Sequence, residues 1–271
     1  MQVIEAKGFA IPAVGLGTWT LRGRECARLT EQAIRLGYRH IDTAQMYDNE
    51  AAVGEGVRAS GKRAEVMVAT KVQPTSLAPH DLERSVKESL ARLRLDVIDL
   101  LLIHWPNPRV PVSETLGAMA RMKRAGYVRA LGVSNFTVAL LDEANRVSPE
   151  PLVCNQIECH PFLDQSKVIA ACRKHGMAVV AYSPVARGNA KGNAVLERIG
   201  EAHGKSAAQV SLRFLVQQGI AVIPRTSKIE RLSENLALFD FALSDQEMVE
   251  IGALSGRNGR IVDWSWSPNW D

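Results

Sequence analysis

Four side chains that can transfer or steer a proton follow one another along the first half of the chain. Asp42 ends a strand-like run in the segment GYRHIDTAQMYDNE, and Tyr47 stands in the polar loop five residues later. Lys71 ends the run VMVATK, and His104 ends the run IDLLLIH. Because chemistry in parallel α/β enzymes sits at the carboxyl ends of the strands and in the loops beyond them, these four residues are predicted to share one site.

These residue types suit the reduction of a carbonyl group. A tyrosine has an ordinary pKa of about 10. We expect the Lys71 ammonium to lower the pKa of Tyr47, while Asp42 keeps the lysine charged and aimed. A histidine within reach can hydrogen-bond the carbonyl oxygen and orient the substrate. The set is therefore predicted to donate a proton to an oxygen that becomes an alkoxide as a hydride arrives.

Each of the four residues alone has a plainer explanation. An aspartate at a strand end is usually a helix cap. A single tyrosine more often packs at the surface, and a lysine at a strand end is more often solvated. His104 is the least ordinary of the four, because it follows an apolar run and precedes Trp-Pro. The prediction therefore depends on the coincidence of all four.

Eight short runs rich in apolar and β-branched residues are predicted to be strands. Several are apolar almost throughout, as expected for strands buried on both faces of a sheet. The runs are 14–17, 39–42, 66–70, 98–104, 128–133, 152–156, 178–182 and 220–223.

Helical patterns lie between these runs. In residues 79–93, apolar residues spaced by four, four and three mark one face of a helix that begins at a proline. Capping boxes at 206–209 and 244–247 open two more helices, and the second of these follows the eighth strand–helix unit.

Strands that alternate with helices, without a composition break, predict one (β/α)8 TIM barrel domain over residues 1–271. An open doubly wound sheet is the alternative. Residues 2–12 are expected to form a hairpin that plugs one end of the barrel. The Trp-rich stretch 258–271 is expected to be an ordered tail, because three exposed tryptophans would leave a large apolar surface in water.

The order of motifs along the chain resembles that of the aldo-keto reductases. The chain is most similar to the short bacterial branch that contains 2,5-diketo-D-gluconate reductases and methylglyoxal reductases. The matching segments, which span nearly the whole chain, are GLGTW, GYRHIDTAxxYxNE, TK, IDLLLIHWP, GVSNF, NQIECHP, AYSP and IPRTSKIERLSEN.

The resemblance implies an NADP(H)-dependent reductase of aldehydes or ketones, with the cofactor across the C-terminal mouth of the barrel. The matching positions make Tyr47 the general acid, Lys71 and Asp42 its tuning pair, and His104 the residue that orients the carbonyl.

Five further positions are implied to hold the cofactor. Ser134, Asn135 and Gln156 would bind the carboxamide of the nicotinamide, Tyr182 would stack on its ring, and Thr18 would be a further contact. Without the resemblance, turn, helix-cap and core-edge roles explain these residues equally well.

A basic cluster lies at the start of the last barrel helix. Basic groups with a hydroxyl at a helix N-terminus suit a phosphate monoester, although a solvated helix start is the first explanation in an unknown fold. The resemblance implies that the cluster binds the 2′-phosphate of NADP(H), with Arg225 where the family commonly has lysine. The cluster consists of Arg225, Thr226, Lys228 and Arg231.

The rest of the nucleotide is also placed by the resemblance. The chain has no GxGxxG after a strand, which argues against a Rossmann phosphate loop. The loop from Ser183 to Gly188 would instead hold the pyrophosphate, and Glu234 and Asn235 would face the adenine.

The composition argues against several classes of protein. Of the 271 residues, 46% are hydrophobic and 23% are charged, and the net charge of +4 is spread along the chain, which does not favour nucleic-acid binding. The start MQVIEAKGFA lacks the apolar stretch of a signal peptide. The four cysteines show no CxxC spacing and are predicted to be reduced and structural. We expect a cytoplasmic monomer without a membrane or nucleic-acid partner.

Two rival functions remain open at this point. A metal-dependent barrel hydrolase could use His40, His104 and His160, but the chain has no HxH pair and His160 precedes a proline. No metal is therefore predicted. Some relatives of the implied fold bind NADPH as regulatory subunits without significant turnover, and loss of Tyr47 or His104 would have indicated that role.

The substrate is the least determined feature. The loop after His104 is short, so an open pocket is expected, with Trp19 and Trp105 as walls and a contribution from Trp264 or Trp266. Such a mouth could accept small dicarbonyls similar to methylglyoxal, keto-sugars or aromatic aldehydes.

Overall fold

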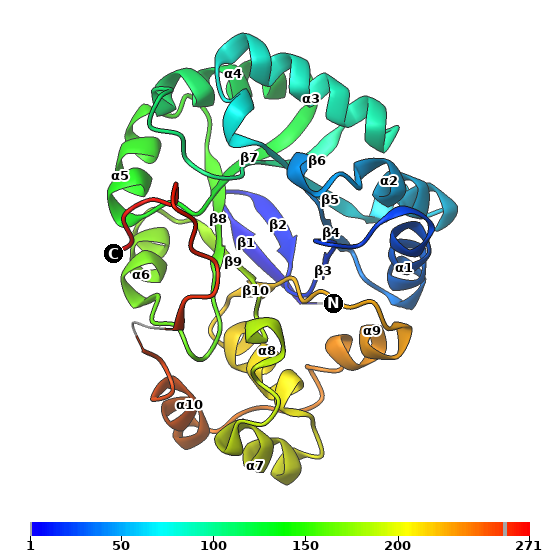
Figure 1. The fold of residues 1–271 in the computed structure, drawn as a ribbon, viewed down its shortest axis with the longest axis vertical. Helices are drawn as coiled ribbons and strands as arrows, with labels where there is room; N and C mark the ends of the chain where they lie inside the picture. Colours follow the sequence, from blue (N-terminus) through cyan, green and yellow to red (C-terminus); the bar gives the residue numbers. More distant parts are fainter. Residues whose placement is uncertain (1, 257–258) are drawn as a thin grey trace.

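The structure, a computed structural model, describes residues 2–256 and 259–271. Its centre is a parallel sheet with the strand order β10-β9-β8-β7-β6-β5-β4-β3 (Figure 1). The strands are buried at nearly every position, which explains their uninterrupted apolar sequences. They are β3 (Leu16–Gly17), β4 (His40–Asp42), β5 (Met67–Val72), β6 (Ile98–Ile103), β7 (Val128–Ser134), β8 (Leu152–Glu158), β9 (Ala178–Tyr182) and β10 (Ala221–Val222).

The sheet closes into a barrel between its first and last strands. The Gly15 N–H donates to the Val222 carbonyl oxygen over 2.8 Å, and the Val222 N–H donates to the Ala13 oxygen over 2.9 Å. A Cβ on Gly17 would stand 2.6 Å from the Ile223 carbonyl oxygen, so only glycine allows this approach. The predicted (β/α)8 barrel is confirmed, and the open-sheet alternative is wrong.

Ten α-helices occur in the described residues, and most of them surround the barrel (Figure 1). The predicted helix face at residues 79–93 is buried, and both predicted capping boxes are present. The helices are α1 (Gly23–Leu36), α2 (Glu50–Ala59), α3 (Pro79–Leu93), α4 (Val112–Arg124), α5 (Val138–Val147), α6 (Ser166–Lys174), α7 (Ala194–His203), α8 (Ala207–Gln217), α9 (Ile229–Leu236) and α10 (Asp245–Gly252).

Two of these helices are additions to the eight-fold repeat. The extra helix α10 was predicted, whereas α7 was not predicted from the sequence patterns. The two helices pack against each other and lie below the barrel in Figure 1. Their shared apolar cluster includes Leu196, Ile199 and Ile251.

The N-terminal hairpin pairs β1 (Val3–Ala6) with β2 (Phe9–Pro12) in antiparallel fashion. Ala6 and Ile11 are buried in one cluster with side chains of the barrel interior, among them Met67 and Val180. The hairpin lies across the barrel axis in Figure 1, as expected for a plug.

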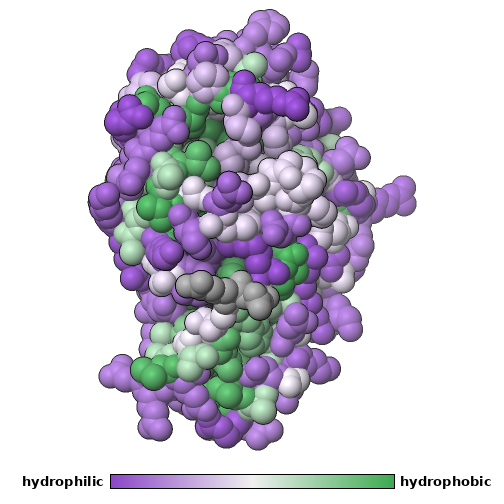
Figure 2. Space-filling view, turned by 60° about the vertical axis from the view of Figure 1, so that its left-hand side comes forward, coloured by the Kyte–Doolittle hydropathy of each residue, from purple (hydrophilic) through white to green (hydrophobic). Residues whose placement is uncertain are grey.

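The stretch 258–271 was predicted to be an ordered tail on the body of the protein. Residue 258 lies outside the described residues, and residues 259–271 lie on the body as predicted. Figure 1 shows it running past α6 and β8 to α5, where the Asp271 carboxylate accepts a 3.0 Å hydrogen bond from the Val138 N–H. The face that carries the tail is mostly hydrophilic, with scattered apolar patches (Figure 2). The four cysteines are free and buried.

Candidate active site

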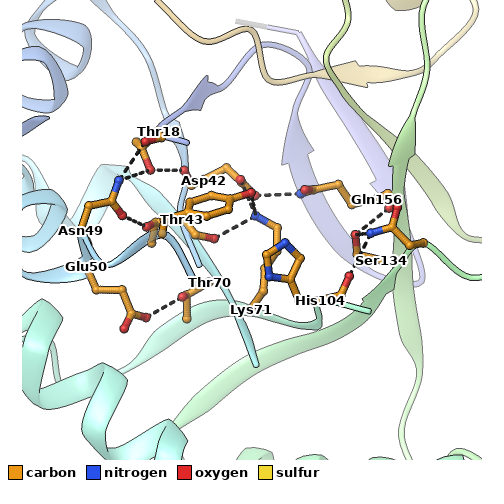
Figure 3. Close-up of polar contacts among 12 residues, drawn as sticks. Thr18, Asp42, Thr43, Asn49, Glu50, Thr70, Lys71, His104, Ser134 and Gln156 are labelled. Atoms are coloured by element: carbon orange, nitrogen blue, oxygen red, sulfur yellow. Dashed lines mark hydrogen bonds and ion pairs between the residues drawn. The ribbon is translucent and has the colours of Figure 1, made fainter. Parts of the chain in front are cut away.

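The ammonium of Lys71 is the centre of the candidate site. Its Nζ atom lies 2.5 Å from Asp42 Oδ1 and 2.9 Å from the Thr43 carbonyl oxygen (Figure 3). It also lies 3.3 Å from Tyr47 Oη. Lys71 is fully buried on β5, and Asp42, at the end of β4, is 1% exposed. Three of the four residues predicted to act together are therefore in direct contact.

The second carboxylate oxygen of Asp42 is also occupied. Gln156 on β8 donates from Nε2 to Asp42 Oδ2 over 2.7 Å, so the amide reaches the acid from across the barrel (Figure 3). Because both oxygens of Asp42 and the lysine are held in this way, the group has little freedom to reorient.

A buried polar layer fixes the segment that carries Tyr47. This tyrosine ends a short 3₁₀ turn, η1 (Gln45–Tyr47). Directly after the turn, Asn49 accepts from Thr43 Oγ1 over 2.6 Å and donates to the Thr18 carbonyl oxygen over 2.8 Å. The turn is thus tied to the ends of β3 and β4.

A second anchor lies on the first residue of α2. Glu50 is 2% exposed and accepts from Thr70 Oγ1 over 2.6 Å and from Arg92 Nε over 2.7 Å. Neither Asn49 nor Glu50 was singled out from the sequence, although their place at the end of the motif that contains Asp42 and Tyr47 was a usable signal.

His104 completes the group of four. It follows β6, is 7% exposed, and meets the Tyr47 ring edge-on with 5.5 Å between ring centroids. Burial, and then the positive charge of Lys71, lower the pKa of His104 well below its usual range. The ring is therefore neutral near pH 7 and carries one N–H. Its Nδ1 atom is buried and has no hydrogen-bond partner among the residues that the structure describes.

The expected net lowering of the Tyr47 pKa is not found. Burial, and then the negative charge of Asp42, raise the pKa of Tyr47 well above its ordinary value. Burial also lowers the pKa of Lys71, and Asp42 acts in the opposite direction. Burial and the nearby Asp42 carboxylate both favour the neutral phenol over the charged phenolate. Tyr47 is held as a neutral phenol, which is the form that can donate a proton.

The residues expected around the nicotinamide gather beside this group. Ser134 Oγ donates to the Gln156 carbonyl oxygen over 2.8 Å, and Asn135 Nδ2 donates to the His104 oxygen over 3.0 Å. Tyr182 Oη donates to Asn135 Oδ1 over 2.8 Å. Thr18 Oγ1 donates to the Asp42 carbonyl oxygen over 2.9 Å. The structure thus brings all of them to the same end of the barrel.

The basic cluster lies at the N-terminal end of α9. Arg225, Lys228 and Arg231 are exposed, and among the described residues none of them forms an ion pair. Thr226 is 3% exposed, and its Oγ1 accepts from the Lys228 N–H over 3.0 Å. No side chain caps the N-terminus of α9, so its first N–H groups and the three cations are available to an anion.

The two residues expected to face the adenine have other contacts. The Glu234 carboxylate accepts a hydrogen bond from Ser206 Oγ, at the N-cap of α8. Asn235 is 7% exposed and lies beside the buried Tyr38. Ser183 stands directly after β9 with a φ of 50°, at the start of the loop expected near the pyrophosphate.

The tryptophans differ from the predicted open pocket. Trp19 is 44% exposed, but Trp105 is only 4% exposed, because Trp266 and Trp270 of the tail pack edge-on against it at centroid distances of 5.1 and 6.0 Å. Trp105 is therefore a covered support and not an open wall. The sequence also gave no sign that Arg187 would lie 4.8 Å above the Trp19 ring.

The three histidines of the metal-site alternative do not meet. His40 Nδ1 faces the Pro12 carbonyl oxygen at 3.4 Å, and His160 Nε2 faces Glu158 Oε1 at 3.0 Å. In the part of the chain that the structure describes, no three His, Cys, Asp or Glu side chains are grouped so that they could hold a metal ion.

The comparison with protein families agrees with the closed (β/α)8 barrel. It also agrees with the group at the mouth of the barrel, which consists of Asp42, Tyr47, Lys71 and His104. The model of the Aldo/keto reductase family matches residues 13–255, and the chain belongs to this family. It is 40% identical over 266 residues to "Methylglyoxal reductase DkgB" of Escherichia coli O157:H7, a match that covers 97% of this chain and 100% of the relative.

Two further relatives agree with this family. "Glyoxal reductase" of Bacillus subtilis (strain 168) is 39% identical over 250 residues, which cover 92% of this chain and 90% of the relative. The crystal structure of a protein provisionally named 2,5-diketo-D-gluconic acid reductase B has a TM-score of 0.98 and 45% identity, and the match covers 100% of this chain and 98% of that chain. Within the described residues, no helix has both the length and the apolar character needed to cross a membrane.

Proposed function

We propose that the protein reduces aldehydes or ketones to alcohols with NADPH, and that Tyr47 is the general acid. Family membership supports an oxidoreductase that acts on carbonyl groups. The observation that carries the finer assignment is the contact of the buried Lys71 ammonium with both Asp42 and the Tyr47 hydroxyl, beside the neutral ring of His104.

Reduced NADP supplies the hydride when it is bound, and the protein supplies the proton. A carbonyl oxygen placed between Tyr47 and His104 would accept a hydrogen bond from each. As negative charge grows on that oxygen, Tyr47 Oη gives up its proton, and the phenolate that remains is stabilised by Lys71 at 3.3 Å. Asp42 holds the lysine in place throughout.

NADPH rather than NADH is proposed because of the basic cluster. The exposed Arg225, Lys228 and Arg231 around the uncapped start of α9 fit a phosphate monoester, which NADH lacks. On the nicotinamide side, Ser134, Asn135, Gln156 and Tyr182 offer a polar rim, although most of their donors already have protein partners.

The substrates proposed are small dicarbonyls or keto-sugars. The names of the relatives refer to methylglyoxal, glyoxal and a diketo sugar acid. The proposal also keeps the predictions of a cytoplasmic monomer that binds neither nucleic acid nor membranes.

The test follows NADPH absorbance with methylglyoxal for the wild-type protein and the Tyr47→Phe variant. The variant should lose turnover by a factor on the order of 10² to 10⁴ and should bind NADPH almost normally. Near-normal turnover by the variant would remove Tyr47 from the mechanism. NADPH binding without turnover by the wild type, across a panel of aldehydes and ketones, would favour the regulatory-subunit alternative.

A further inference from the structure

A fully buried carboxylate at the end of β8 is not used by the proposed chemistry. Glu158 is 0% exposed, and its Oε1 lies 3.0 Å from His160 Nε2. Oε1 also accepts from the Ile261 N–H over 2.6 Å, and Oε2 accepts from the Val262 N–H over 2.8 Å. Two of its contacts therefore go to consecutive backbone amides of the tail, more than a hundred residues away.

These contacts keep Glu158 ionised. Burial alone would raise its pKa, but the hydrogen bonds from His160, Ile261 and Val262 outweigh burial and lower the pKa. Hydrogen bonds to an ionised acceptor are stronger than those between neutral groups. Glu158 thus forms a short, charged connection between the tail and the barrel.

The residues that follow this connection form an aromatic wall. Trp264 and Trp266 are stacked, with 6.2 Å between ring centroids and an angle of 7° between planes, and they are 49% and 46% exposed. Trp266 and Trp270 both pack on Trp105, the residue next to His104. We call Trp264, Trp266 and Trp270 the tryptophan wall.

The wall has its own internal contacts but few to the barrel. Arg260 lies 3.7 Å above the Trp270 ring, and Trp270 Nε1 donates to Asp263 Oδ1 over 3.0 Å. These contacts join one part of the tail to another. Within the described residues, the tail also packs on Trp105 and accepts a hydrogen bond from Val138 at Asp271, and its hydrogen bonds to a barrel strand are those to Glu158.

We propose that Glu158 is a positioning residue for substrate selection: its carboxylate latches the tail at Ile261 and Val262, and it thereby holds the tryptophan wall against Trp105 beside the reacting carbonyl. This inference rests on the proposed carbonyl reduction. The plainer alternative is that Glu158 and His160 are only a buried pair that stabilises the end of β8.

The first test measures the latch without any reaction. In Glu158→Gln, an amide replaces the carboxylate, so the backbone N–H groups of Ile261 and Val262 lose a charged acceptor. Hydrogen exchange in a peptide covering these residues should become roughly 10- to 100-fold faster, because bonds to charged acceptors are among the stronger ones in proteins. The matched control Glu150→Gln removes a carboxylate that pairs with Lys123 and Arg124, each at 3.0 Å, and should leave this exchange unchanged.

The second test measures substrate selection. The KM of Glu158→Gln for 4-nitrobenzaldehyde should rise about 3- to 10-fold, the range expected for loss of one aromatic contact. Its kcat should stay within about twofold, since the contact is made equally before and during the reaction. Methylglyoxal has no aromatic ring to pack on the tryptophan wall, so its KM should change less. The dissociation constant of NADPH should not change.

A second variant covers a failure of Glu158→Gln to fold. Val262→Pro removes the N–H that donates to Glu158 Oε2 and leaves the carboxylate in place, so exchange of the remaining Ile261 N–H should become faster and the KM values should change in the same way. Unchanged exchange in both variants would overturn the latch. Faster exchange with an unchanged ratio of the two KM values would overturn the role in selection. If the wild-type protein reduces neither aldehyde, the proposed function fails, and the exchange result still decides the latch.

Discussion

The ends of strands β4 to β6 and the start of α9 hold charged side chains in opposite ways. At the strand ends, Lys71 is fully buried and its ammonium has three oxygen partners within 3.3 Å. At the start of α9, Arg225, Lys228 and Arg231 are exposed, and within the described residues none is paired with an acid. The first group is assembled by the fold itself, whereas the second is open to an ion from outside.

This difference in burial determines what each region can do. A buried charge is stable only with partners on all sides, so the site must be preorganised, and any loss of a partner has a large effect. Exposed cations keep their hydration and are screened by salt, so each makes a modest and tunable contribution. Chemistry suits the first environment, and recognition of a phosphate suits the second.

The largest expected effect comes from removing the buried charge. In Lys71→Met, the phenolate left after proton transfer loses its stabilising ammonium, and Asp42 loses its partner. Turnover should fall by a factor on the order of 10² to 10⁴, with NADPH binding nearly intact. NADPH absorbance gives the turnover, and tryptophan fluorescence gives the binding. The control Lys174→Met, which removes an exposed lysine paired with Asp142 at 3.3 Å, should keep wild-type turnover.

A second prediction tests how completely water is excluded from the buried region around His40. His40 is 0% exposed on β4, two residues before Asp42, and burial lowers its pKa to about 4. Above pH 6.5 this histidine is neutral in the folded and unfolded states. Below pH 6.5 the unfolded chain binds a proton that the folded protein rejects, so stability is lost as the pH falls toward 4 and no further below it. The loss is about 3 kcal/mol, from the gap to an unfolded pKa of about 6.5.

Urea unfolding of the wild type and of His40→Gln at pH 7 and pH 4.5 checks this prediction. Other groups also titrate in this range, but they do so in both proteins. The free energy of unfolding should therefore fall by about 2 to 3 kcal/mol more in the wild type than in the variant. An equal fall in the two proteins would show that water reaches His40.

The sequence predicted the fold well because each strand and helix carries a local signal. The eight apolar runs, the two capping boxes and the helix face at 79–93 are all found in the structure. The helix α7 was missed because only Leu196, Ile199 and Gly200 of it are buried, which leaves a short apolar pattern in the sequence.

The grouping of the four residues was predicted from the sequence, but the direction of the Tyr47 pKa was not. Local motifs identified Asp42, Tyr47, Lys71 and His104, which the structure brings together. The direction of the Tyr47 pKa depends on how much water the closed site excludes, and this is a property of the packed fold. The covering of Trp105 and the latch at Glu158 depend on contacts with the tail, more than a hundred residues away along the chain.

The smallest expected effect concerns the exposed region. In Arg231→Ala one cation is removed from the start of α9, where a 2′-phosphate would be bound. A charge-assisted hydrogen bond contributes about 1.5 to 3 kcal/mol, so the dissociation constant of NADPH should rise roughly 10- to 100-fold, and less where solvent screens the site. NADH lacks the phosphate, so its binding should barely change.

The dependence of NADPH binding on salt concentration distinguishes the exposed cations at the start of α9 from the buried group around Lys71. The wild-type preference for NADPH over NADH should narrow as ionic strength rises, because exposed charges are screened. The defect of Lys71→Met should hardly respond to salt, since its partners are buried. Equal losses for NADPH and NADH in Arg231→Ala would place this arginine elsewhere on the nucleotide. A wild-type preference for NADH would refute the phosphate site, and the contrast between the two regions would then rest on burial alone.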